Sequence, residues 1–342
     1  MDELSKTEAR NYLSAAGFFV LGLIYLLIIF GDHTSHLPQI AYLGIGFSLL
    51  IIGILLLVLR KRDMIGILFI MLSAINITNG FISGFLGEIL LLGFNVMLFL
   101  TILITLTGKD KAKWVLIIIP LLMLITSLVD TFGGARPEIS PAVITLFAVS
   151  AVVCMYFAFC CASERIHLPG RKILTADEQT DFKASGSVLG YMLFASTSGM
   201  YVLYYFFGDP QILLEYTHII DVVASFLMVI IAILLFTVGK MRFTPVMFMI
   251  LALTEFLGLS LSGSLFIGLA IGLIILGLFA MLRKESRILP GIMIIIYAGT
   301  FLFSVYAGAT MPMVSAVLNA IPCLIAIYLA FVVYSQKKLP KF

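Results

Sequence analysis

Long apolar stretches dominate this chain and decide the solvent in which it folds. They run without interruption for about 20 residues, the length at which a helix crosses a bilayer, and do not alternate as the strands of a barrel do. Of the 342 residues, 62% are hydrophobic and only 11% are charged, whereas a soluble domain carries about 25% charged residues. The sequence therefore predicts an all-α polytopic membrane protein whose main partner is the lipid bilayer.

One hydrophilic segment, residues 163–187, divides these stretches into two blocks of similar length. We predict a first six-helix repeat at 1–162, a cytoplasmic linker at 163–187 and a second six-helix repeat at 188–342. Because six is an even number, the two repeats enter the membrane in the same orientation and are parallel. The twelve transmembrane helices are predicted at 12–31, 38–59, 64–83, 88–107, 113–131, 140–162, 188–207, 217–238, 243–262, 264–282, 288–307 and 313–335.

The basic residues predict the orientation of these helices. All 21 Lys and Arg residues except Arg136 fall in the terminal segments, the linker or the loops that a count of twelve spans places on one face. Cytoplasmic loops carry the excess of Lys and Arg in membrane proteins. We therefore expect a multi-pass protein of the plasma membrane with both termini in the cytoplasm.

The opposite face is predicted to be acidic. Its acids attract cations or protons toward an entrance, or they are simply what remains when the basic residues are confined to the other face. The neighbouring residues Asp32, His33 and His36 are interpreted as solvated, and no metal site is predicted. The acids of this face are Asp32, Asp130, Glu138, Asp209 and Glu215, together with Glu88 and Asp221 at predicted helix starts.

The two blocks resemble each other in sequence. Residues 13–18 (LSAAGF) align with 189–194 (LGYMLF), and residues 155–159 (MYFAF) align with 327–331 (IYLAF). Each block ends in a basic segment that contains Leu-Pro, and the offset stays between about 171 and 177 residues. A steady offset favours an internal duplication over chance similarity between apolar helices.

These residues resemble a known family. The run 189–194 is similar to the end of the motif NPAPLGLxGF, which opens the first helix of the acetate and succinate uptake permeases, and 13–18 is a looser version of it. The run 326–330 (AIYLA) is similar to the last helix of that family. The resemblance implies a six-helix pore unit present twice, with Phe18 and Phe194 at apolar constrictions. It also implies a ring of six units, which a doubled chain completes as a trimer.

The chain departs from that family in two places. The Asn-Pro-Ala-Pro head of the motif is absent from both halves. The family has a central Tyr in its third helix, and the aligned positions here hold Ser73 and Leu251. The resemblance thus supplies Phe18 and Phe194 to a pore but not the tyrosine.

Polar side chains within the spans are the candidate path residues. Glu255, next to Thr254, lies about 18 Å along its predicted helix, and an acid at that depth must face protein or water. It is interpreted as a proton-coupling acid or as a neutral carboxyl bonded to a neighbouring helix. The amides of Asn76, Asn79 and Asn95 line a polar path in the first half or serve as contacts between helices.

Hydroxyl groups cluster in the first span of the second half. Ser196, Thr197 and Ser198 are expected to bond mainly to their own backbone carbonyls. Tyr201, Tyr204 and Tyr205 follow them toward the outer end of that span. We interpret these tyrosines as interfacial anchors.

The sequence contains no nucleotide-binding loop, no zinc-protease helix and no nucleophile elbow. Its basic residues are spread among loops instead of forming a nucleic-acid surface. We predict no enzyme, no catalytic residue, no cofactor and no nucleic-acid partner. The predicted function is transport of a small monocarboxylate such as acetate, with protons or through a channel. The alternatives are a channel for another small solute and a membrane scaffold or stress-response protein that transports nothing.

Overall fold

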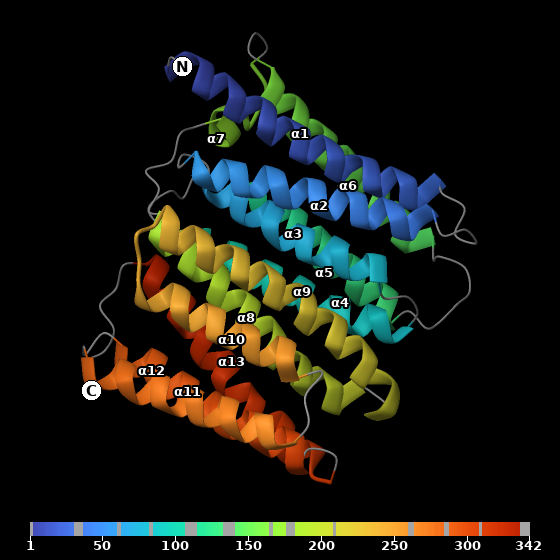
Figure 1. The fold of residues 1–342 in the computed structure, drawn as a ribbon. Coiled ribbons are helices and arrows are strands. Elements are labelled where there is room, and N and C mark those ends of the chain that lie inside the picture. Colours follow the sequence, from blue (N-terminus) through green and yellow to red (C-terminus); the bar gives the residue numbers. More distant parts are fainter. Residues whose placement is uncertain are drawn as a thin grey trace. The chain divides into compact units, whose positions relative to one another are not determined.

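A computed structural model describes most of the chain (Figure 1). The described residues are 3–30, 37–59, 63–81, 85–106, 115–132, 141–163, 167–175, 182–207, 210–258, 263–283, 287–307 and 310–335. Within these ranges the regular structure is entirely helical. It consists of twelve helices of 15 to 28 residues and one short helix, α7.

The chain forms two compact units, Met1–Ser185 and Gly186–Phe342. The first unit holds α1 (Glu3–Phe30), α2 (Leu37–Val58), α3 (Asp63–Phe81), α4 (Phe85–Leu106), α5 (Ile118–Phe132), α6 (Pro141–Ala162) and α7 (Arg171–Thr175). The second holds most of α8 (Phe182–Phe207), then α9 (Pro210–Thr237), α10 (Phe243–Gly258), α11 (Gly263–Arg283), α12 (Ile288–Ala307) and α13 (Pro312–Tyr334).

Seven helices of the described part are long and apolar enough to cross a membrane. Their mean hydropathy lies between 1.8 and 3.0, and apolar helices of this length indicate a membrane protein. The predicted all-helical membrane class is confirmed in this respect. The seven segments are Thr7–Phe30, Gln39–Val58, Met64–Phe81, Val115–Phe132, Pro141–Ala162, Ile219–Thr237 and Pro312–Tyr334.

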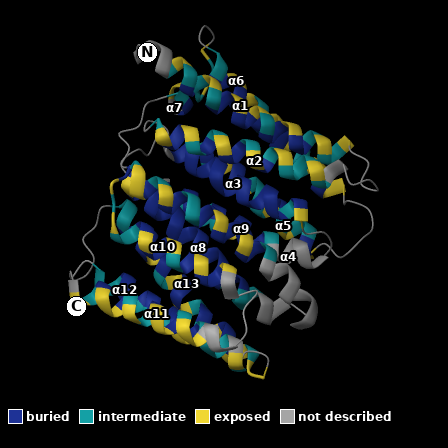
Figure 2. Cartoon of the chain, in the orientation of Figure 1, coloured by how far each residue is buried: buried dark blue, intermediate teal, exposed yellow. Residues whose placement is uncertain are grey.

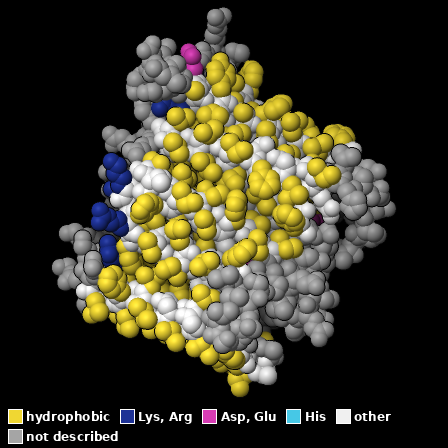
Figure 3. All heavy atoms as spheres, viewed as in Figure 1, with side chains coloured by type: hydrophobic (Ala, Val, Ile, Leu, Met, Phe, Trp, Pro, Cys, Tyr) yellow, Lys and Arg dark blue, Asp and Glu magenta, His cyan; other side chains and the backbone are white. Residues whose placement is uncertain are grey.

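The helices are apolar on their outer faces as well as on their inner faces. On α1, Phe19, Leu23 and Leu27 repeat every four residues and are exposed, whereas Phe18 and Leu21 are fully buried. Figure 2 shows a similar exposed stripe on α11, and Figure 3 shows hydrophobic side chains spread over the described part of the face in view. An outer stripe of this kind is unfavourable in water and favourable in lipid.

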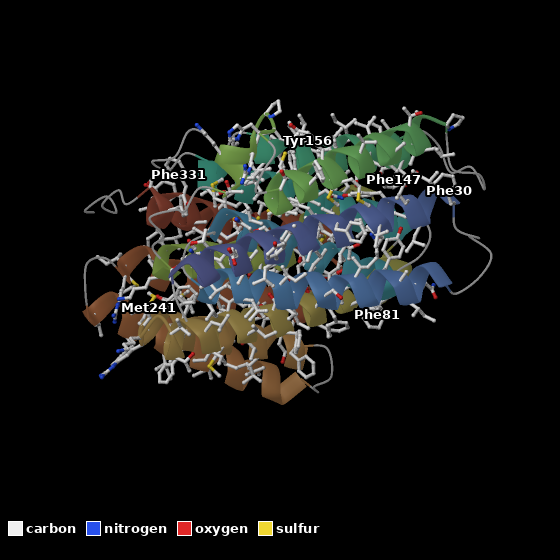
Figure 4. The ribbon with its side chains drawn as sticks, turned by 90° about the horizontal axis from the view of Figure 1, so that it is seen from above. Phe30, Phe81, Phe147, Tyr156, Met241 and Phe331 are labelled. Atoms are coloured by element: carbon white, nitrogen blue, oxygen red, sulfur yellow. The ribbon has the colours of Figure 1, made fainter. Side chains whose placement is uncertain are left out.

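Consecutive helices run in opposite directions within each unit. Phe30 and Phe81, at the ends of α1 and α3, lie at the same end of the first unit (Figure 4). Met241 and Phe331 lie at a common end of the second unit. Two residues on consecutive helices therefore lie at the same level of the bundle when they are equally far from the ends that the connecting loop joins.

Small residues allow the closest helix pairs to form. A Cβ atom on Gly53 of α2 would come within 3.0 Å of the Gly66 carbonyl oxygen on α3. In the second unit, a Cβ atom on Gly277 of α11 would come within 2.8 Å of the Gly291 carbonyl oxygen on α12. Backbones approach this closely where no side chain intervenes, as is usual in membrane helix packing.

The same contact occurs inside each unit, between its first and its third long helix. A Cβ atom on Gly17 of α1 would overlap the Phe69 ring of α3, at 2.2 Å, and one on Gly190 of α8 would overlap the Phe248 ring of α10, at 2.1 Å. The next residue along also packs edge-on against that ring, Phe18 at 5.0 Å and Tyr191 at 5.1 Å between ring centroids. By these contacts Phe18 corresponds to Tyr191. The sequence alignment instead places Phe18 opposite Phe194, three residues further along.

Helix α8 begins inside the segment predicted to be a linker. It starts at Phe182, and Phe182, Ala184 and Ser185 are buried. Gly186 packs so tightly against Leu235 of α9 that a Cβ atom would lie 2.7 Å from its side chain. The small residues that gave this segment its linker-like composition are the ones that admit close helix packing.

Candidate functional site

Helix α8 carries the centre of the candidate site. Its residues from Ala184 to Ser198 are all buried. It meets α9 through Gly186, α10 through Gly190 and α12 through Phe194, whose ring lies 4.9 Å from that of Tyr297. The Cys323 thiol of α13 donates to the Ala195 carbonyl oxygen at 3.4 Å. Helix α8 therefore packs against four other helices of the second unit.

Glu255 of α10 is buried in this region, as predicted, with 3% of its surface exposed. Its Oε1 atom lies 3.1 Å from the Thr197 hydroxyl oxygen on α8, and that hydroxyl also lies 2.8 Å from the Phe194 carbonyl oxygen. A threonine hydroxyl has one proton to donate. If it donates to the nearer carbonyl, the contact with Glu255 is completed by a protonated carboxyl that donates to threonine.

A second carboxyl, Asp221, belongs to the same site. The prediction that it begins a helix on the outer face was wrong, because α9 starts at Pro210 and Asp221 lies eleven residues further on, with 1% of its surface exposed. Thr197 lies ten residues before the end of α8. Both residues are thus about 15 Å from the adjoining ends of α8 and α9.

Two tyrosines interact with the carboxyls. The Tyr201 hydroxyl on α8 hydrogen-bonds the Asp221 carboxyl, so this tyrosine is not simply an interfacial anchor. The Tyr297 hydroxyl on α12 approaches Glu255 closely enough to interact with it, without completing a hydrogen bond of standard geometry. Asp221 and Glu255 also lie within electrostatic range of each other.

The carboxyls have no buried cation beside them in the part of the second unit that the structure describes. The buried charged residues of the described chain are Asp221, Glu255 and Arg10, and Arg10 belongs to α1 in the first unit. Burial of an unpaired charge is expensive, and a buried acid without a cation is held neutral instead. Neighbouring like charges add to that cost.

Several oxygen atoms around the carboxyls lack a hydrogen-bond partner among the described residues. They are Asp221 Oδ1, Ser198 Oγ and Ser225 Oγ, all on buried residues. Ser225 lies four residues after Asp221 and Ser198 three residues before Tyr201, so each pair shares a helix face. A buried polar atom without a partner costs about 1–3 kcal/mol, and such a group favours a bound water molecule or polar solute.

The structure brings together only some of the predicted path residues of the second unit. Phe194 and Glu255 both contact Tyr297. The Thr254 hydroxyl instead donates to the Ile250 carbonyl oxygen of its own helix at 2.8 Å. The Ser196 hydroxyl likewise donates to the Met192 carbonyl oxygen, which confirms the predicted backbone bonding for that residue.

The predicted residues of the first unit do not form a comparable cluster. Phe18 is buried among the rings of Phe69 and Phe157. Asn76 donates to the carbonyl oxygen of Leu72 on its own helix at 2.7 Å, and Asn79 is partly exposed. Asn95 of α4 donates to the Ser127 hydroxyl of α5 at 2.6 Å, which is a contact between helices.

Sequence reasoning missed Asp221, Tyr201 and Tyr297 as members of the site. The signal for Asp221 was the proline at position 210, since proline favours the first turn of a helix and places the start of α9 earlier. No local signal distinguishes Tyr297 from a lipid-facing tyrosine. Asp32, His33 and His36 lie outside the described residues. Within the described residues no group of three His, Cys, Asp or Glu side chains is placed to hold a metal ion.

Comparisons of this chain with known protein families, curated proteins and solved structures give no match. The resemblance to the acetate and succinate permeases therefore stays a prediction.

Proposed function

We propose that this chain is a membrane transport protein that moves a small monocarboxylate, such as acetate, together with a proton. Its twelve long helices would form two parallel six-helix repeats in the plasma membrane, with both termini in the cytoplasm. The shared contacts of Gly17 with Phe69 and of Gly190 with Phe248 support the repeat. Three such chains would assemble as a trimer if the resemblance to the permease family extends to assembly.

The observation that carries the proposal is the pair of buried carboxyls on apolar helices. Glu255 and Asp221 are surrounded by hydroxyl groups, and some of the nearby oxygen atoms have no partner among the described residues. A purely structural bundle gains little from such groups, because an acid at mid-membrane costs about 2.5–3.5 kcal/mol on insertion scales. Intramembrane acids of this kind typically lie on proton or substrate paths.

The chemistry of the site suits a small weak acid. A carboxylic acid crosses an apolar barrier more easily when it is neutral, because the cost of desolvating the charge is avoided. Hydroxyl groups of Thr197, Tyr201 and Tyr297 supply hydrogen bonds for a carboxyl group, and the Phe194 ring supplies an apolar neighbour for a short alkyl chain. The same surroundings suit other small polar solutes, which are the nearest alternative substrates.

A membrane scaffold that transports nothing is the second candidate. It is favoured by the contacts of Ser196 and Thr254 with their own backbone and by the Asn95–Ser127 contact between helices. A scaffold needs its polar groups paired, whereas a transporter needs some of them available to a solute.

Uptake of labelled acetate into proteoliposomes tests the proposal. Purified protein is compared with and without an inward proton gradient, as wild type, Glu255→Gln and the exposed control Glu8→Gln. We expect uptake that follows the gradient in wild type and in the control and that is lost in Glu255→Gln.

Two other outcomes have defined meanings. Uptake that ignores the gradient and survives in Glu255→Gln would indicate a channel in which Glu255 is structural. Absence of uptake above empty liposomes, with a monodisperse folded protein, would exclude acetate. A panel of other small solutes would then separate a different substrate from a scaffold.

A further inference from the structure

We infer that Asp221 and Glu255 act as one proton-binding unit, in which the two carboxyls hold a single exchangeable proton between them and Tyr201 and Tyr297 keep them in place. As a coupling site the pair rests on the transport function proposed above. The shared proton itself is a property of the chain that can be measured without any substrate.

The first support for this unit is the arrangement of its four side chains. Asp221 comes from α9, Glu255 from α10, Tyr201 from α8 and Tyr297 from α12. Each carboxyl interacts with one tyrosine hydroxyl, and the two carboxyls interact with each other. Tyr297 lies within electrostatic range of Asp221 as well as of Glu255. A change of charge on one acid is therefore felt by every member.

The second support is the absence of compensating charge around the pair. Among the described residues, the titratable side chains that face it are the two tyrosines, and α13 contributes Cys323, whose thiol is bonded to the Ala195 carbonyl. The described Lys and Arg side chains of α8 and of the second unit, at positions 183, 240, 242 and 287, are not buried. Two ionised carboxyls close together without a cation repel each other strongly, and such pairs release their protons in coupled steps.

The third support is the hydrogen bonding of Thr197. Its hydroxyl lies within donating distance of the Phe194 carbonyl oxygen and also of Glu255 Oε1, at 2.8 and 3.1 Å. With its proton directed to the carbonyl, threonine accepts a hydrogen bond from the protonated carboxyl of Glu255. Asp221 accepts a hydrogen bond from Tyr201, and its Oδ1 atom has no partner among the described residues. The geometry points to a neutral Glu255 that donates to threonine, with Asp221 as the neighbouring acid whose charge depends on the proton that the two share.

Infrared spectroscopy of the full chain in liposomes tests this unit. The C=O stretch of a protonated carboxyl in an apolar environment is followed between about pH 5 and 8 in wild type, Glu255→Gln, Asp221→Asn, the double variant and the exposed control Glu8→Gln. We expect one titrating band in wild type that is unchanged in the control and absent in the double variant.

The single variants decide whether the acids are coupled. Because Asp221→Asn removes a neighbouring negative charge, the Glu255 band should disappear at a pH lower by about one unit or more, and Glu255→Gln should do the same for Asp221. The inference would be overturned if wild type showed two bands that titrate as the bands of the single variants do. It would also be overturned if the wild-type band did not change in this pH range. Loss of the band on addition of Na⁺ at constant pH would also overturn it, in favour of a metal cation site.

The test of the proton-binding unit and the test of transport can fail independently of each other. Coupled titration without acetate uptake would keep the proton-binding unit and remove the proposed substrate. Proton-driven uptake with independent titrations would keep the function and remove the unit. Each variant is accepted only if it elutes as a monodisperse species in detergent, and the isosteric amides were chosen so that packing is preserved.

Discussion

The two units place different chemistry at the same structural position. Asn76 lies seven residues after Phe69 on α3, and Glu255 lies seven residues after Phe248 on α10. Both phenylalanines pack against a glycine of the neighbouring helix, so the two polar side chains occupy matching places two turns further on. The amide bonds its own backbone, whereas the carboxyl reaches another helix.

The partner helix explains the difference. Seven residues after Gly190 stands Thr197, which contacts Glu255, and seven residues after Gly17 stands Ile24, which is apolar and buried. An acid at position 76 would have no hydroxyl at the matching place, and an amide that bonds the Leu72 carbonyl is the less costly choice there. The matching position therefore holds an amide bonded within its own helix in the first unit and a carboxyl that contacts another helix in the second unit.

The largest expected effect of this difference is on transport. Glu255→Gln should reduce proton-driven acetate uptake by about tenfold or more, since it removes the exchangeable proton of the site. Asn76→Ala should reduce it by only about twofold, because Asn76 bonds its own helix. Initial rates in proteoliposomes of equal protein content provide the measurement. Equal losses in the two variants would mean that both units carry the substrate.

Stability should change alike in the two units where their framework is shared. Gly17→Ala and Gly190→Ala each place a methyl group into a phenylalanine ring, and overpacking of this kind costs about 1–3 kcal/mol. Unfolding by detergent titration, followed by circular dichroism, should give similar losses for both.

Paired variants sharpen that comparison. Phe69→Leu should restore Gly17→Ala, and Phe248→Leu should restore Gly190→Ala, because the smaller side chain gives room to the added methyl group. A large loss in one unit alone would contradict the equivalence of the two contacts.

The sequence predicted the parts of this molecule that depend on local composition. Apolar runs of about 20 residues are sufficient to predict membrane helices, and the burial of Glu255 followed from its distance to the nearest charged loop. The neighbours of Glu255 were not predictable in this way, because Asp221 and Tyr297 are 34 residues before it and 42 residues after it. Such partners meet only through helix packing.

Two local errors have physical reasons of their own. The predicted start of α9 was near residue 217, which made Asp221 an outer-face acid. The helix in fact begins at Pro210, and its first turns are less apolar than the rest, so the apolar run alone does not reveal them. The start of α8 was placed at 188 because its small polar residues resemble a linker, although they serve close packing against Leu235. Side-chain polarity is a poor guide to helix ends where helix backbones are in close contact.

The Thr197 hydroxyl should have a smaller effect than Glu255. Thr197→Val keeps the shape and removes the hydrogen bond to Glu255 together with the one to the Phe194 carbonyl oxygen. The bond to Glu255 is worth about 1 kcal/mol, or about fivefold in uptake rate. Thr197→Ser retains the hydroxyl and should restore most of the rate. The change Ile24→Thr, at the matching place in the first unit, should not raise uptake. Equal rates for the valine and serine variants would show that only packing matters at position 197.

The smallest expected effects concern polar contacts between helices, which are worth about 0.6 kcal/mol on average in membranes. Ser127→Ala should exceed that average and reach about 1–2 kcal/mol. The Oδ1 atom of Asn95 has no partner among the described residues, and this change would remove the hydrogen bond of its amide nitrogen as well. Ser304→Ala should stay near the average, since Asn319 keeps its bond to the Ser315 carbonyl oxygen at 2.9 Å. Detergent unfolding titrations of both variants give the comparison. A larger loss for Ser304→Ala would mean that the hydrogen-bonded hydroxyls of Ser304 and Ser315, 2.7 Å apart, hold α12 and α13 together. Hydrogen bonds between helices would then stabilise the second unit well beyond the carboxyl pair.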